Sequence, residues 1–178
     1  MPSLNQTAHL RSTMRLALFE PDIPQNAGAM LRLAACLGIA VDLVEPCGFV
    51  LSDRRLRRAG LDYLDKVTLS RHPSWEAYQT ARAASGAGRL ILLSSRAEVS
   101  YLDFSFRPDD TILVGRETVG VPEEVHETAD ARLRVPMRAG LRSLNVALSA
   151  AMVLGEALRQ TGHFPAILPA LVGALGGL

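Results

Sequence analysis

Short apolar runs alternate with longer amphipathic segments along most of this 178-residue chain. The runs are bounded by prolines, glycines and polar residues, a pattern that is typical of buried strands. They predict strands over Arg15–Glu20, Ile39–Val44, Lys66–Ser70, Arg89–Ser94, Thr111–Gly115 and Arg132–Val135.

The segments between these runs repeat apolar residues at helical spacing. They predict helices over Gln25–Gly38, Asp53–Gly60, Pro73–Ala84 and Ser143–Gln160, with Val99–Asp110 as a loop. Trp75 and Tyr78 have the spacing of core residues rather than of a base-stacking platform. Strands that alternate with helices indicate an α/β fold, with a mostly parallel sheet flanked by helices.

Composition narrows the class of protein without naming its partner. A hydrophobic content of 48% and a net charge of +1 are ordinary for a globular domain. The two cysteines lie in no CxxC pair, so neither a structural zinc site nor a disulfide framework is expected. The N-terminus has no apolar signal region, and we expect a cytoplasmic protein without a membrane anchor.

The basic residues are biased, because Lys66 is the only lysine and all the others are arginines. Arginine pairs with phosphate and stacks on bases, but a GC-rich genome produces the same bias. Four arginines lie within five positions, which favours phosphate binding over a solvated face with scattered ion pairs. They are Arg54, Arg55, Arg57 and Arg58.

Small and polar residues gather where the predicted strands and helices begin or end, which is where α/β proteins bind ligands. Asn26 and Gly28 open the first helix, where an anion is favoured, although Asn26 could equally be a plain N-cap. Gly115 ends a strand and could equally be an ordinary turn. Arg32 lies well inside the first helix and could be an ordinary solvated arginine.

Three motifs occur in the order found in one family: Asn26-x-Gly28-x-x-x-Arg32, Gly115-x-Glu117-x-x-Gly120, and Val135-Pro136-Met137 with Ser143-Leu144-Asn145. In these motifs the chain resembles the SPOUT superfamily of RNA methyltransferases, in its branch that methylates the ribose 2′-hydroxyl. The segments FEPDIPQNAGAMLRL, VEPCGF and DRRLRRAGLDY resemble, more closely, the small tRNA (cytidine/uridine-34) 2′-O-methyltransferases. The resemblance covers roughly residues 15–162.

The resemblance implies a fold that no general rule predicts, since the family has a C-terminal trefoil knot and knots are otherwise rare. It also implies a homodimer formed through the knot region. The expected organisation is a flexible leader over residues 1–14, one SPOUT domain over residues 15–162 and an apolar tail over residues 163–178.

The resemblance further implies S-adenosylmethionine as cofactor, no metal, and tRNA as partner. The cofactor-binding residues would be Leu93, Gly115, Gly120, Val135, Met137, Ser143 and Leu144. The catalytic residues would be Arg32, Asn26, Glu117, Ser143 and Asn145, with Asn26 and Glu117 orienting Arg32. Because a guanidinium stays protonated in proteins, we expect Arg32 to align the substrate rather than to accept its proton.

Arg116 departs from the family, which often has a small or neutral residue there. It would either contact a phosphate beside the cofactor or point to solvent. For RNA binding, the arginine cluster of one subunit would act beside the pocket of the other, with Arg138 and Arg142 as further contacts.

Three other interpretations compete with this one. The first is an enzyme of the same branch that acts on another tRNA site or on ribosomal RNA. The second is a catalytically silent, knotted RNA-binding protein, against which the intact motifs argue. The third is an ordinary nucleotide-binding α/β protein, which lacks support because no GxGxxG or Walker lysine is present.

Overall fold

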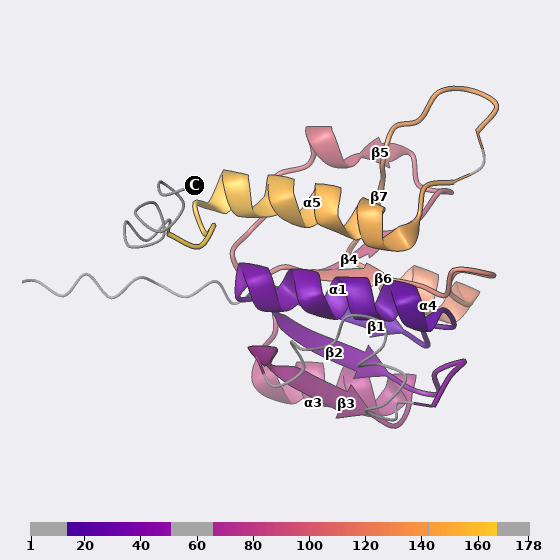
Figure 1. Cartoon of the computed structure of the whole chain (residues 1–178), viewed down its shortest axis with the longest axis vertical. Coiled ribbons are helices and arrows are strands. Elements are labelled where there is room, and N and C mark those ends of the chain that lie inside the picture. Colours follow the sequence, from indigo (N-terminus) through magenta and orange to yellow (C-terminus); the bar gives the residue numbers. More distant parts are fainter. Residues whose placement is uncertain (1–13, 51–65, 142, 167–178) are drawn as a thin grey trace, which may run out of the picture.

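The structure, a computed structural model, describes residues 14–50, 66–141 and 143–166 (Figure 1). The strands are β1 (Arg15–Phe19), β2 (Ala40–Val44), β3 (Leu69–His72), β4 (Leu90–Leu93), β5 (Val99–Ser100), β6 (Thr111–Val114) and β7 (Ala131–Arg134). The helices are α1 (Pro24–Leu37), α3 (Trp75–Ser85), α4 (Glu123–Thr128), α5 (Val146–Thr161) and the 3₁₀ turn η2 (Tyr101–Asp103).

The described strands form one seven-stranded sheet in the order β3-β2-β1-β6-β4-β7-β5. Every neighbouring pair in it is parallel, which confirms the predicted α/β class. The central strands are buried on both faces, so they read as continuous apolar runs in the sequence.

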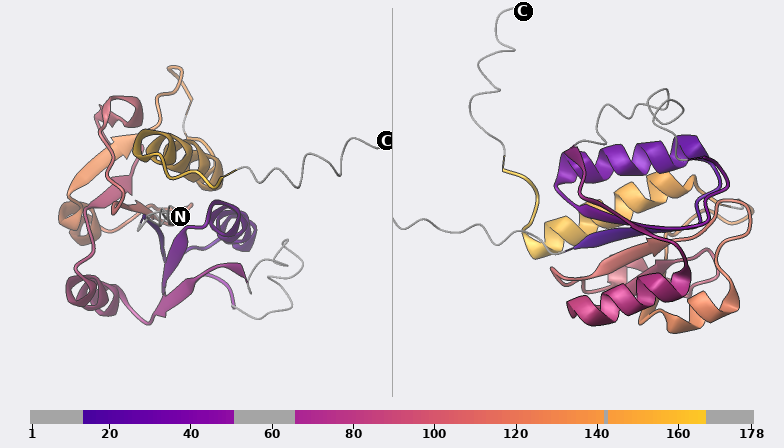
Figure 2. Two further views of the ribbon diagram at one scale, coloured as in Figure 1. Left: turned by 90° about the vertical axis from the view of Figure 1, so that its left-hand side faces the viewer. Right: turned by 90° about the horizontal axis from the view of Figure 1, so that it is seen from below.

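Two helical layers cover the sheet, α1 and α5 on one face and α3 and α4 on the other (Figure 2). Alternate residues of each strand serve the two layers. In β1, Leu16 and Leu18 pack in the core with α1 and α5. Ala17 and Phe19 instead pack with Trp75 of α3 and other residues of the second core, as the sequence predicted for Trp75.

A buried carboxylate ties three strands together on one side of the sheet. Asp42 of β2 is only 4% exposed. It accepts hydrogen bonds of 2.6 and 2.9 Å from Arg15 of β1 and lies 2.9 Å from Nε2 of His72 of β3. Such a charge stays buried because its partners replace the water that it loses.

Several predicted element boundaries differ from those in the structure. The predicted strand Lys66–Ser70 is wrong in position: β3 begins at Leu69, in register with Val41 of β2, and runs to His72. The last helix begins at Val146 instead of Ser143, because Asn145 caps it. The expected loop Val99–Asp110 contains β5 and η2, and α4 was not predicted.

Some predicted segments fall outside the described residues. These are the helix Asp53–Gly60 with its arginine cluster, Arg142, nearly all of the leader and most of the apolar tail. Within the described part of the chain, no helix combines the length and apolar character that a membrane span requires.

Candidate active site

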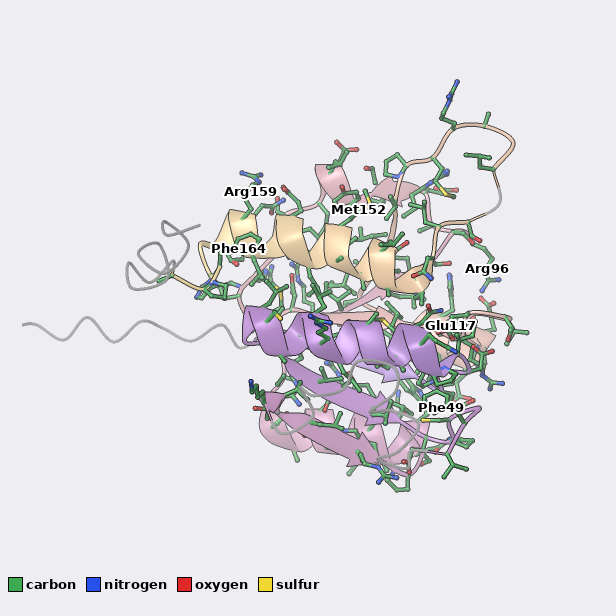
Figure 3. All side chains as sticks on the ribbon, viewed as in Figure 1. Phe49, Arg96, Glu117, Met152, Arg159 and Phe164 are labelled. Atoms are coloured by element: carbon green, nitrogen blue, oxygen red, sulfur yellow. The ribbon has the colours of Figure 1, made fainter. Side chains whose placement is uncertain are left out.

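A cavity of about 650 Å³ opens where the carboxyl ends of β4, β6 and β7 meet the N-termini of α1 and α5. Its walls come from the residues that follow these three strands, from the start of α1 and from Ser143–Ser149. Arg96 and Glu117 both line it, and they lie toward the same end of the molecule, opposite Arg159 and Phe164 (Figure 3). The volume is within the range of small-molecule sites.

The cavity brings together most of the residues that the sequence singled out. It is lined by Asn26, Leu93, Gly115, Glu117, Gly120, Val135, Met137, Ser143, Leu144 and Asn145. These residues come from all three motifs, and the fold unites them although they are far apart in the chain. Their individual roles stay predictions.

Two predicted residues within the described ranges do not line the cavity. Arg32 is exposed on α1, six residues after Asn26 and hence about 9 Å further along the helix axis. Arg138 is exposed in the segment between β7 and α5. Arg32 is therefore separated from the cavity wall that Asn26 and Glu117 form.

The side-chain amide of Asn145 links the N-terminus of α5 to α1. The Asn145 side-chain oxygen accepts hydrogen bonds from the N–H groups of Ala147 (2.9 Å) and Leu148 (3.3 Å), which caps the helix. Its amide nitrogen then donates to Oδ1 of Asn26 (2.9 Å). Asn26 itself is not an N-cap, and that alternative is wrong, because Ile23 occupies the cap position of α1.

The loop after β6 is closely packed against its own turn. Arg116 and Gly120 exchange backbone hydrogen bonds of 2.9 and 3.1 Å, and Gly120 has the left-handed φ of 72°. A Cβ on Gly115 would lie 2.7 Å from Cγ1 of Val121 and 2.8 Å from the carbonyl carbon of Gly120. At position 115 a glycine is required because any Cβ would overlap neighbouring atoms. At position 120 it is favoured because the backbone has a left-handed φ.

Arg116 lines the cavity, where a phosphate contact stays a prediction, and it also forms an ion pair that the sequence did not suggest. Its guanidinium donates to a carboxylate oxygen of Glu20, just after β1, and lies 5.9 Å from the centre of the Phe19 ring. Its Nε is buried. The solvent-pointing alternative is therefore wrong, and the arginine links the β6 loop to the end of β1.

Glu117 contacts a residue that the sequence analysis missed, Asp22. The Asp22 N–H donates to Oε2 of Glu117 (3.1 Å), and the Glu117 N–H donates to Oδ1 of Asp22 (3.0 Å). The hydroxyl of Thr118 donates to the other Asp22 oxygen. The only sequence signal for Asp22 was its place between Pro21 and Pro24, beside Asn26.

The cavity wall includes further residues outside the predicted set, among them Ser94, Arg96, Arg134 and Ser149. Ser94 lies at the end of the predicted strand Arg89–Ser94, which the sequence already indicated as a candidate ligand edge, and Arg134 could have been found in the same way at the carboxyl end of its strand. Within the described residues, no group of three or more His, Cys, Asp or Glu side chains could hold a metal ion.

The sequence comparisons agree with one another. The profile of the family described as SpoU rRNA Methylase matches residues 13–155. A tRNA (cytidine(34)-2′-O)-methyltransferase of Beijerinckia indica is 58% identical over 155 residues, which cover 87% of this chain and 96% of the relative. A protein of the same name from Ancylobacter novellus is 55% identical over 152 residues, covering 85% and 96%.

Solved structures give the same fold. A structure from work on the 2-OH methylation of C/U34 on tRNA is 43% identical with a TM-score of 0.77, covering 83% of this chain and 95% of the other. The SpoU methyltransferase AviRb of Streptomyces viridochromogenes, in complex with AdoMet, is 27% identical with a TM-score of 0.74, covering 85% and 59%.

We expect Gly115→Ala to destabilise the protein by about 2–3 kcal/mol, because the added methyl group overlaps atoms that cannot move freely. Gly120→Ala is the matched control, since its Cβ would meet nothing within 4 Å and only its left-handed φ opposes it. That control should cost about 1 kcal/mol. Urea unfolding measures both, and equal losses would contradict the packing argument.

Proposed function

The chain belongs to the SpoU rRNA methylase family, and on that premise we propose that it methylates the 2′-hydroxyl of the wobble ribose, nucleotide 34, of tRNA. The observation that carries this proposal is the single cavity lined by residues of all three motifs. The relative from Beijerinckia indica supports the tRNA site, because the match extends over nearly its whole length. A tRNA-modifying enzyme of this kind works in the cytoplasm.

The methyl donor is S-adenosylmethionine, as the AdoMet-bound AviRb structure suggests. The cavity fits such a molecule in size and in lining, since apolar side chains such as Leu93 and Val135 line it together with two glycines, Gly115 and Gly120. Leu93, Gly115, Gly120, Val135, Met137, Ser143 and Leu144 would hold it. When bound, it supplies a methyl group on a positively charged sulfur that a hydroxyl oxygen can attack. No metal takes part.

The chain's own work is mainly positioning, because the reaction needs the ribose hydroxyl aligned with the methyl group. Asn145 serves this by fixing the start of α5 and the Asn26 amide at the same wall. Glu117 lies in the cavity wall on the loop after β6. Ser143 contributes a hydroxyl on the segment that leads into α5.

Arg32 aligns the RNA by pairing with a phosphate next to the target ribose. Its exposure on α1, outside the cavity wall, suits a contact with the large substrate better than one with the cofactor. A guanidinium is also too basic to accept the hydroxyl proton. The proton then goes to a substrate phosphate or to solvent.

The homodimer forms through α5. Leu148 and Met152 lie four residues apart on this helix and are 60% and 43% exposed, with Leu144 (41%) just before it. Residues four apart share one helix face, so these side chains form an apolar stripe that a second subunit can cover. In that dimer the arginine cluster of one subunit holds tRNA beside the cavity of the other.

The trefoil knot is part of the same proposal. It would pass the segment between β7 and α5 through the chain that precedes it, which suits a cavity wall built from Val135, Met137 and Ser143. The alternatives are methylation of another tRNA or ribosomal RNA site, and RNA binding without catalysis. The mapping experiment below separates them.

The central test is methyl transfer from labelled S-adenosylmethionine to tRNA from cells that lack the activity, followed by mapping of the methylated nucleotide. We expect label on ribose 34 and a loss of at least about a hundredfold in rate for Arg32→Ala, because alignment is lost. Arg159→Ala is the control, since Arg159 is exposed at the far end of α5 and pairs with Glu156. Label at another nucleotide would mean that the enzyme methylates a different RNA site. Cofactor binding without any transfer of label would favour the RNA-binding protein without catalytic activity.

Replacing Arg57 and Arg58 by alanine should weaken tRNA binding and flatten its salt dependence. Each lost phosphate contact lowers the slope of log K against log salt by roughly 0.7–0.9. Filter binding across a salt series measures this, with Arg107→Ala, an exposed arginine before β6, as the control. An unchanged slope would remove these arginines from the RNA-binding surface.

Leu148→Glu should convert the dimer to a monomer, because it buries an unpaired charge in the apolar stripe. We expect the dimer dissociation constant to rise at least about a hundredfold, which corresponds to roughly 2.7 kcal/mol. Sedimentation velocity measures it, with Leu102→Glu as control, since Leu102 is equally exposed (59%) but lies on η2. A variant that stays dimeric would place the interface elsewhere.

A further inference from the structure

Asp22 and Glu117 form a carboxyl pair between the ends of two neighbouring strands. Each donates its own backbone N–H to a carboxylate oxygen of the other, at 3.1 and 3.0 Å. The pairing therefore fixes both the backbones and the side chains. Glu117 lines the cavity whereas Asp22 does not, so Asp22 lies behind the wall that Glu117 presents.

The two carboxyl groups are not equivalent in their surroundings. Asp22 accepts hydrogen bonds from the Glu117 N–H and from the Thr118 hydroxyl, both of which favour its ionised form. It also lies just before the N-terminus of α1, whose first turn holds no acidic residue, so the helix dipole favours a negative charge there. Oε1 of Glu117, by contrast, is buried without a hydrogen-bond partner among the described residues.

The pKa values follow this asymmetry. Hydrogen bonding with Glu117 and Thr118 lowers the pKa of Asp22 to about 2, against the opposing effect of burial. Burial raises the pKa of Glu117, and the neighbouring Asp22 side chain raises it further. Glu117 thus keeps its proton to higher pH than an ordinary glutamate.

The other charged groups near Asp22 and Glu117 already have partners of their own or lie elsewhere in the cavity wall. Glu20 lies on the Asp22 side, and it is itself paired with Arg116 of the Glu117 loop. Arg96 and Arg134 also line the cavity, and Arg96 is partnered by Glu123 at 3.4 Å. From α1 and α5 the nearest polar groups are the neutral amides of Asn26 and Asn145, which bond to each other.

We propose that Asp22 is a positioning residue of the active site, which holds Glu117 at the cavity wall through the two hydrogen bonds that join the N–H of each residue to the carboxylate of the other. Asp22 acts only through Glu117 and does not touch the substrate or the cofactor. The role in catalysis rests on the proposed function, but the pairing of Asp22 with Glu117 is a property of the protein alone.

The first experiment follows the carboxyl carbons of Glu117 and Asp22 by ¹³C NMR through a pH titration of the cofactor-free protein. Glu117→Gln and Asp22→Asn assign the two signals. We expect the Glu117 signal to titrate above 4.5 in the wild type and at lower pH in Asp22→Asn, because the neighbouring carboxylate is gone. Asp103→Asn, an exposed aspartate on η2, is the matched control and should move neither signal.

A second variant keeps the test possible if Asp22→Asn fails to fold. Thr118→Val removes only the hydroxyl that donates to Asp22, so the Asp22 signal should titrate at higher pH. If Glu117 titrates near 4.5 in the wild type, or if neither variant shifts the titration of its partner, the two carboxyl groups are not coupled and the inference fails.

The activity measurement then tests the positioning role. Asp22→Asn should lower kcat by about tenfold to a hundredfold while KM for tRNA stays within about twofold, since only the placement of Glu117 changes. The limb of the pH profile that Glu117→Gln abolishes should move to lower pH in Asp22→Asn. If this limb of the pH profile does not move, Asp22 has only a structural role. Absence of methyl transfer by the wild type would instead refute the proposed function and leave the NMR result standing.

Discussion

The common direction of the strands is the constraint on which the site depends. The registers align Leu18 of β1, Val114 of β6, Leu93 of β4 and Leu133 of β7 at one level of the sheet. The residues that follow are Phe19, Gly115, Ser94 and Arg134, and they lie at one edge of the sheet, where all four strands end or have just ended. Parallel strands bring their carboxyl ends together in this way, so loops that are distant in sequence share one cavity.

Side chains from the two flanking elements then close that edge. Asn145 satisfies the free N–H groups of α5 and holds Asn26 of α1 with the same amide. Asp22 and Glu117 join the end of β1 to the loop after β6. Each of these residues both stabilises a helix or loop terminus and shapes the cavity, which means that local folding and the geometry of the site cannot be separated here.

The sequence predicted those parts of the fold that depend on local patterns. Buried runs such as that of β6 and stop signals such as Gly38, which is the left-handed C-cap of α1, are visible in one dimension. The boundary of β3 could not be predicted in this way, because its register is set by pairing with β2 and by the contact of His72 with Asp42.

The candidate site was predicted unevenly for a similar reason. Gly115 and Asn145 belong to motifs, and both line the cavity. Asp22 has no motif of its own, since its importance arises only when β1 and β6 lie side by side. The position of Arg32 outside the cavity wall likewise follows from the direction of α1, which spacing alone does not give.

The central place of β1 in the sheet has a consequence for the order of events during synthesis. Arg15 pairs with Ala40 on one side, soon after it is made, but its partner on the other side is Thr111. An emerging chain therefore exposes one unpaired edge of its first strand until most of the protein has been translated. Such long-range pairing is slow and leaves an edge open to wrong partners. Co-translational folding of this protein should accordingly be completed late, and the cavity forms last, with α5.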